Sequence, residues 1–222
     1  MLGNSVPLFR LLGFEVKLDF SWIFLAALVS WSLATGYFPQ NLEGLSAGTY
    51  WWMAIAGAIG LFASIILHEL SHSLVARQYG LPITGITLFI FGGVAEMERE
   101  PPTPRAEFMM AIAGPIASYL LAGIFYLLSG IGSGSPLASV AAYLALINFV
   151  LGTFNLIPAF PLDGGRALRA ILWSTSGDLT GSTRRTATLG QMFGAVMIGL
   201  GLVSLFYGNT IGGIWWALIV LP

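Results

Sequence analysis

Two histidines with a glutamate between them are the residues whose types and spacing first suggest chemistry. His68, Glu69 and His72 form the pattern His-Glu-x-x-His, and the chain contains no other histidine. On a helix, residues four apart share a face, so both imidazoles can reach one metal ion while the glutamate lies beside it. Zinc bound in this way activates water for hydrolysis. The pattern therefore predicts a zinc hydrolase site on a helix.

A catalytic zinc site takes a third protein ligand. The chain has no cysteine, which also excludes disulfides and a thiolate nucleophile. Asp163 lies at the end of an apolar segment with no evident charge partner, so it is the predicted third ligand. Asn155, at the end of the same segment, is expected to bind a substrate carbonyl or an oxyanion. Its alternative role is a hydrogen bond to a neighbouring helix.

The elements that position these residues must lie in a membrane. Of the 222 residues, 56% are hydrophobic and only 9% are charged, whereas soluble chains have about 25% charged residues. Residues 20–42, 108–162 and 186–222 contain no charged side chain. About 20 apolar residues cross a bilayer core, so these stretches indicate a polytopic membrane protein rather than a soluble enzyme. The net charge of −1, with no basic run, gives nucleic-acid binding no electrostatic support.

The predicted fold is an all-α polytopic membrane protein with six transmembrane helices in one domain over residues 1–222. The spans are expected at about 20–38, 50–79, 108–128, 137–158, 188–206 and 211–222. The sixth is short and ends without a charged flank, so the native chain is expected to continue. The alternative for the first apolar segment is a cleaved signal peptide. About twenty residues precede this segment, which is too many for the short basic region that begins a signal peptide.

Basic residues predict the orientation. All nine Lys and Arg lie before the first span, or in the segments after the second and the fourth. Such residues concentrate on the cytoplasmic side of membrane proteins. We therefore expect a multi-pass protein of the cell membrane with a cytoplasmic N-terminus. The same topology places His68, His72 and Asp163 toward the cytoplasmic side.

Two segments outside the spans have the patterns of strands. Residues 14–20 alternate between apolar and charged side chains, and residues 83–98 are rich in Ile, Thr, Phe and Val. Gly92 and Gly93 divide the second segment in the manner of a hairpin. A small cytoplasmic-side β-sheet is expected, whose edge is suited to take a substrate strand by main-chain pairing.

A row of small residues leads to the histidines. Ala56, Gly60, Ser64, His68 and His72 follow one another at intervals of four. Small residues in this pattern let membrane helices pack closely. We expect another helix to pass near the histidine face and to complete the metal site.

These motifs together resemble the site-2 protease family of intramembrane zinc metalloproteases. The resemblance rests on His-Glu-x-x-His, on Asn-x-x-Pro at 155–158, on Leu-Asp-Gly-Gly-Arg at 162–166, and on Gly114-Pro115, which the pattern places at the opening of the third span. Some members carry CBS modules after the sixth span. In this chain such modules would follow Pro222.

The resemblance implies roles for individual residues. His68, His72 and Asp163 would hold one Zn²⁺ per chain, and Glu69 would act as general base. Asn155 would help to hold the substrate backbone, and the strand segment around Gly92 and Gly93 would steady an extended substrate. The implied activity is zinc metalloendopeptidase cleavage in or near a transmembrane segment. Its partners would be the lipid bilayer and a membrane-anchored protein or signal peptide, and the oligomeric state is left open.

Other functions fit a membrane-embedded His-Glu-x-x-His less well. A zinc transporter or sensor would show several ligand clusters along a path, whereas this chain has one set near one face. An inactive relative that only binds membrane helices would not need Glu69. A membrane protease for prenylated or soluble peptides would take a downstream glutamate as third ligand, and Asp163 favours the site-2 type instead.

Overall fold

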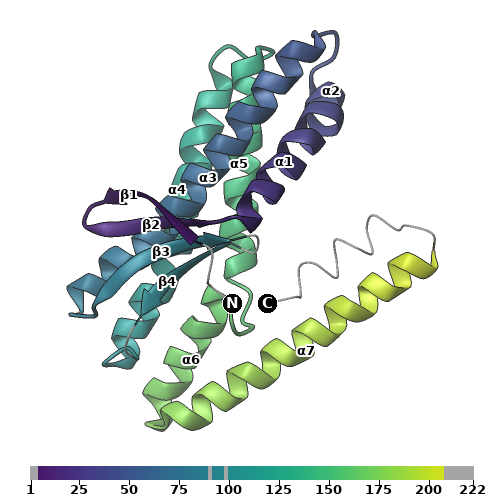
Figure 1. Cartoon of the computed structure of the whole chain (residues 1–222). Helices are drawn as coiled ribbons and strands as arrows, with labels where there is room; N and C mark the ends of the chain where they lie inside the picture. The colour runs from purple at the N-terminus through teal and green to yellow at the C-terminus, as the bar shows by residue number, and fades with distance from the viewer. Residues whose placement is uncertain (1–4, 90–91, 98–99, 208–222) are drawn as a thin grey trace. The chain divides into compact units, whose positions relative to one another are not determined.

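The computed structural model describes residues 5–89, 92–97 and 100–207 (Figure 1). Its elements are β1 (Ser5–Leu11), β2 (Phe14–Asp19), α1 (Ser21–Ser32), the π-helical turn η1 (Leu33–Tyr37), α2 (Phe38–Asn41), α3 (Ala47–Gln78), β3 (Ile83–Phe89), β4 (Gly92–Met97), α4 (Pro104–Gly130), α5 (Pro136–Asn155), α6 (Asp163–Ser176) and α7 (Leu179–Phe206). The chain forms two compact units, one from Met1–Pro101 with Ala113–Phe154 and one from Pro102–Ile112 with Asn155–Pro222.

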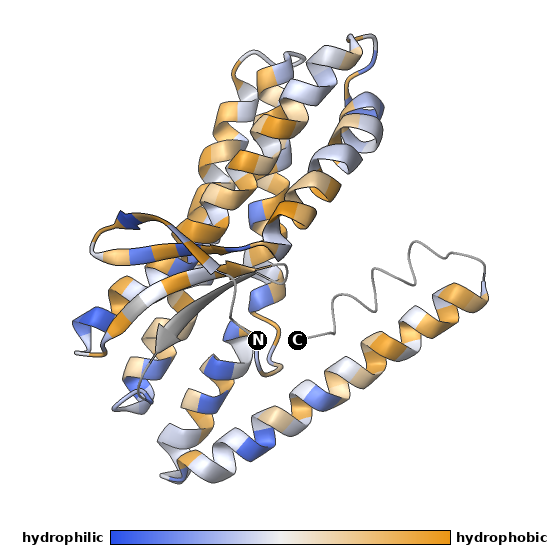
Figure 2. Ribbon diagram, in the orientation of Figure 1, coloured by the Kyte–Doolittle hydropathy of each residue, from blue (hydrophilic) through white to orange (hydrophobic). Residues whose placement is uncertain are grey.

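Five helical segments in the described part of the chain are long and apolar enough to cross a membrane. They are Ser21–Asn41, Ala47–Gln78, Pro104–Gly130, Pro136–Asn155 and Leu179–Phe206. Figure 2 shows hydrophobic residues along these helices. The first five predicted spans are therefore confirmed as helices of sufficient length. The sixth, at 211–222, lies outside the described residues.

A four-stranded sheet with the order β1-β2-β3-β4 joins the helices of the first unit. β1 pairs antiparallel with β2, β2 pairs parallel with β3, and β3 pairs antiparallel with β4. The predicted strands at 14–20 and 83–98 are thus confirmed as β2 and the β3–β4 pair, while β1 was not expected. Gly92 and Gly93 begin β4 rather than forming the turn.

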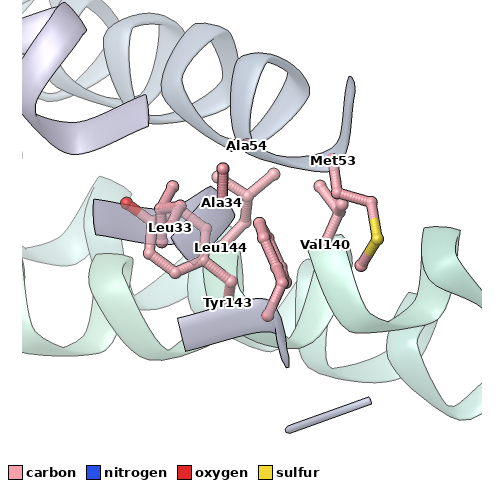
Figure 3. Close-up of a cluster of buried hydrophobic side chains, with 8 residues drawn as sticks. Leu33, Ala34, Met53, Ala54, Val140, Tyr143 and Leu144 are labelled. Atoms are coloured by element: carbon pink, nitrogen blue, oxygen red, sulfur yellow. The ribbon is translucent and has the colours of Figure 1, made fainter. Parts of the chain in front are cut away.

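Two apolar clusters hold α3 in place within the first unit. Its first half packs against η1, α2 and α5 through the cluster of Leu33, Ala34, Phe38, Met53, Ala54, Val140, Tyr143 and Leu144 (Figure 3). Its second half packs on the sheet through the cluster of Phe14, Val16, Ile66, Leu70, Ile86 and Leu88. Lipid tails are as apolar as these side chains, so close packing rather than removal from water stabilises such contacts.

The connection between the fourth and fifth spans contains a helix that the sequence did not predict. Asp163 is the first residue of this helix, α6, and Gly164 and Gly165 follow it. A Cβ on Gly164 would overlap the carbonyl of Leu156, and one on Gly165 would lie 2.7 Å from the Cα of Phe160. Only glycine allows the preceding loop to approach the first turn of α6 this closely.

A buried ion pair ties α4 to α6 in the second unit. Arg169 Nε donates to Glu107 Oε1 at 2.6 Å, and Arg169 Nη2 contacts the same oxygen. Glu107 is fully buried and Arg169 is 6% exposed. The Arg169 guanidinium also lies 5.6 Å from the centroid of the Phe160 ring. One arginine thus fixes α6 and the loop that precedes Asp163.

Candidate metal centre

Both histidines lie on one face of α3, as their spacing predicts. This 32-residue helix begins after Ser46, whose side chain accepts a hydrogen bond from the Thr49 backbone N–H. His68 and His72 are buried, and their ring centroids are 4.9 Å apart. The two imidazoles are therefore close enough to bind one ion.

Ser118 of α4 holds one of these rings. His68 Nδ1 lies 2.8 Å from Ser118 Oγ, and both groups are buried. An imidazole that binds a metal through Nε2 carries its proton on Nδ1, so His68 then donates this hydrogen bond to the serine oxygen. The contact leaves the Nε2 lone pair available. Sequence reasoning missed Ser118 because no motif marks it.

Gly114 of α4 faces the point where the two Nε2 atoms converge. A Cβ on this residue would overlap Nε2 of His72 and lie 2.6 Å from Nε2 of His68. The predicted place of Gly114 and Pro115 at the opening of a span is wrong, because α4 begins at Pro104 and Pro115 lies inside it. The glycine leaves room beside the two imidazole nitrogens, where any ion bound through them would have to lie.

The row of small residues on α3 packs against other helices, as expected, but against two of them, α5 and α4. A Cβ on Gly60 would lie 2.6 Å from Cδ1 of Leu144 in α5. Asn148 Nδ2, also on α5, donates to Ser64 Oγ at 2.9 Å. Farther along α3, the histidines meet α4 instead. α4 contributes Gly114 and Ser118 beside the histidines, and the expectation that a passing helix completes the ligand set stays a prediction.

Asp163, the predicted third ligand, belongs to the second unit, where it is the buried first residue of α6. The two histidines belong to the first unit, so the assignment of Asp163 to their metal site stays a prediction. Two imidazole nitrogens and one carboxylate oxygen are a ligand set that zinc takes in hydrolases. The residues present therefore fit a zinc ion.

The remaining predicted site residues have defined places in the fold. Glu69 is half-buried on α3 between the histidines, and Asn155 is the half-buried last residue of α5. Gly92 and Gly93 pair with Phe89 and Leu88 at the start of β4. Their roles stay predictions.

A family comparison decides the class of this chain. The profile of "Peptidase family M50" matches residues 56–141 and 131–200, which include the histidines of α3 and Asp163. The chain belongs to peptidase family M50. The family resemblance read from the motifs is thereby confirmed, since this is the family of the site-2 proteases.

Individual family M50 relatives agree with this assignment. The structure resembles that of the site-2 protease from Methanocaldococcus jannaschii, with a TM-score of 0.66 and 33% identity over 98% of this chain and 94% of that one. Rip3 of Mycobacterium tuberculosis is 40% identical over 98% of this chain, and MJ0392 of M. jannaschii is 36% identical over 92%. The names of both describe a zinc metalloprotease. The chain spans 56% of the length of each of these two relatives.

Proposed function

We propose that this chain is an intramembrane zinc metalloprotease that hydrolyses a peptide bond in or near a transmembrane segment of a membrane-anchored protein or signal peptide. The observation that carries the proposal is the pair of buried imidazoles of His68 and His72, whose ring centroids are 4.9 Å apart, with Asp163 proposed as the third ligand. Membership of family M50 and five helices able to span a membrane support it. The ion would be one Zn²⁺ per chain.

The proposed chemistry divides between the ion and the chain. When bound, zinc polarises a peptide carbonyl and lowers the pKa of water to about 7. Glu69 is one residue after His68 and three before His72, so its side chain projects from α3 near the histidine face. Its carboxylate takes the proton of the attacking water and passes it to the leaving amine. This transfer requires Glu69 to be ionised before the reaction.

Two further elements would hold the substrate. A transmembrane helix conceals its carbonyls in i to i−4 hydrogen bonds, so it must unwind before cleavage. β4, which begins with Gly92 and Gly93, is an edge strand of the described sheet, and its outer edge can pair with an unwound segment. The Asn155 amide can both donate to and accept from a substrate backbone. Substrates with Gly or Pro in the helix should unwind more readily.

We also propose six spans, with a cytoplasmic N-terminus and an active site toward the cytoplasmic side of the cell membrane. All nine basic residues lie in segments that this orientation makes cytoplasmic. Because the chain has no native cysteine, single-cysteine variants can test it by labelling in intact cells. Ser133→Cys, between α4 and α5, should react with an impermeant maleimide, and Gln78→Cys should not. The reverse pattern would overturn the orientation.

Metal analysis tests the ligand assignment without a known substrate. The purified chain in detergent should bind about one zinc per chain, and His68→Ala and Asp163→Ala should lose it. Glu43→Gln, in the exposed loop between α2 and α3, is the matched control and should keep it. Zinc that survives in Asp163→Ala would show that the third ligand lies elsewhere. A wild-type chain that binds no zinc would overturn the enzyme proposal itself.

A further inference from the structure

The hairpin of β1 and β2 exposes apolar side chains that nothing in the described chain covers. Val6, Leu8 and Phe9 of β1 and Leu12 of the turn are each 43% to 59% exposed. An edge strand of a water-exposed sheet is usually protected by charges or prolines. The edge strand contains Pro7 and Arg10, but it also carries large exposed apolar residues, and Figure 2 shows hydrophobic colouring along parts of β1 and its turn, interrupted by a hydrophilic section.

These side chains extend an apolar face that already packs on α3. Val6 pairs with Leu18 and Phe9 pairs with Val16, and directly opposed residues project from the same side of a sheet. Val16 is fully buried in the cluster that joins the sheet to α3, and Leu18 packs against that cluster. Val6 and Phe9 therefore continue the same face where α3 no longer covers it. Figure 1 shows β1 as the outer strand of the sheet, next to β2.

The turn residue gives a second, independent indication. Leu12 and Gly13 both have positive φ, 50° and 91°, and a two-residue turn of this kind favours Asn or Gly. A leucine is strained in this left-handed conformation, because its Cβ comes close to the following carbonyl oxygen. The chain nevertheless places a large apolar residue there, with 59% of its surface exposed. A bulky side chain in a strained turn suggests a function for that side chain.

The tip is also held in a fixed position. Arg77, near the end of α3, donates from Nη1 to the Leu12 carbonyl at 2.8 Å. Its guanidinium lies 4.9 Å from the centroid of the Phe14 ring. The exposed leucine is therefore part of a braced structure and not of a loose loop.

The surface that continues from this face is the lipid-facing side of a span. β2 ends at Asp19 and α1 begins at Ser21, and Ser5 of β1 pairs with Asp19 at this junction. Phe20, between β2 and α1, is 59% exposed, and Phe24 on α1 is 67% exposed. α1 belongs to a helical segment apolar enough to cross a membrane. The apolar face of β1 thus meets the surface that lipid must cover.

We propose that the β1–β2 hairpin is an interfacial membrane anchor, which inserts Val6, Phe9 and Leu12 among the lipid chains at the edge of the bilayer. Interfacial elements bind through buried apolar area, supplemented by basic groups near the headgroups. Arg10 projects from the opposite side of the strand to Phe9 and lies 4.0 Å from Glu15. Its side chain is 79% exposed and long enough to reach headgroup phosphates around the edge of the strand. The anchor would fix the depth of the sheet, including the edge strand β4. It does not depend on the chain being a protease.

Site-directed spin labelling tests this anchor directly. Because the chain has no cysteine, Leu12→Cys carries one nitroxide label, in vesicles of phosphatidylcholine and phosphatidylglycerol. Phe24→Cys on α1 is the lipid-facing control, and Gln78→Cys at the exposed end of α3 is the water-facing control. The Leu12 label should collide readily with oxygen, as at Phe24, and be shielded several-fold from a water-soluble nickel chelate relative to Gln78.

Two other results would overturn the anchor. A Leu12 label as accessible to the nickel chelate as that at Gln78 would show that the tip lies in water. A label shielded from both reagents, with dipolar broadening between labels, would show that a second copy of the chain covers the hairpin.

A second variant separates lipid insertion from folding of the turn. Asparagine suits the backbone of Leu12 better than leucine does, so Leu12→Asn should keep the hairpin folded. In a Leu8→Cys background, this substitution should raise collisions of the label with the nickel chelate several-fold. An unchanged collision rate would show that Leu12 does not hold the hairpin in the lipid.

Discussion

His68 Nδ1, on α3, lies 2.8 Å from Ser118 Oγ, on α4, and both groups are buried. This hydrogen bond orients the imidazole and leaves Nε2 available for a metal. Histidines that bind metals are usually oriented in this way, by a hydrogen bond from the other ring nitrogen. In this chain a neutral hydroxyl accepts it. The geometry of the candidate metal centre therefore depends on a residue outside every recognisable motif.

Removing the Ser118 hydroxyl should weaken metal binding without unfolding the chain. Ser118→Ala is expected to lower zinc affinity about 10- to 100-fold, and the visible spectrum of the Co²⁺-substituted protein should shift as His68 becomes less constrained. Ser118→Thr, which restores the hydroxyl, should recover both. Ser129→Ala on the same helix, where the serine bonds only within α4, is the control. Unchanged affinity and spectrum in Ser118→Ala would refute the positioning role.

Adding one methyl group at Gly114 should separate stability from metal binding. Alanine is favoured over glycine inside a helix by about 1 kcal/mol, so Gly114→Ala should not destabilise α4 by itself. Its Cβ would nevertheless overlap Nε2 of His72 and should abolish zinc binding. Gly123→Ala on the same helix, whose Cβ would meet nothing within 4 Å, should bind zinc normally. The zinc content of the two variants is measured in parallel. Full zinc occupancy in Gly114→Ala would contradict the inference that Gly114 leaves room for the ion beside the two imidazoles.

Replacing the proposed general base should leave the metal in place. Glu69→Gln is expected to retain zinc but to lose cleavage of a membrane-anchored substrate by about 10²- to 10⁴-fold, the usual contribution of general acid–base catalysis. Glu43→Gln again serves as the matched control. Retained cleavage in Glu69→Gln would exclude Glu69 as the base, and loss of its zinc would point to a structural role.

Sequence patterns predicted the elements whose structure follows from the local distribution of apolar and charged residues. Charge-free stretches, together with the apolar run that begins near residue 50, predicted the five long helices of the described residues. Alternation predicted β2, and a composition rich in Ile, Thr, Phe and Val predicted the β3–β4 pair. The approach of His68 and His72 followed from helical spacing alone. α6 was missed because it is short and amphipathic and lies among charges, and β1 because nothing in the sequence shows which strand it pairs with. Ser118 could not be found, since its distance from His68 depends on how α3 and α4 pack.

The buried pair of Glu107 and Arg169 gives a prediction about stability. Glu107→Gln leaves a buried guanidinium without its carboxylate, which should lower the free energy of unfolding by about 3–5 kcal/mol. The double variant Glu107→Leu/Arg169→Met removes both charges and should recover most of that loss. The surface pair of Arg10, which is exposed, and Glu15, which is partly exposed, at 4.0 Å, is the comparison, and Glu15→Gln should change stability by less than about 1 kcal/mol.

Unfolding in mixed detergent, followed by circular dichroism, measures these differences. Because Arg169 also contacts the ring of Phe160, in the loop that leads to Asp163, Glu107→Gln should reduce zinc affinity as well. A Glu107→Gln variant as stable as wild type would show that water reaches the guanidinium. A double variant as unstable as the single one would show that packing around Arg169, and not its charge, holds α6 in place.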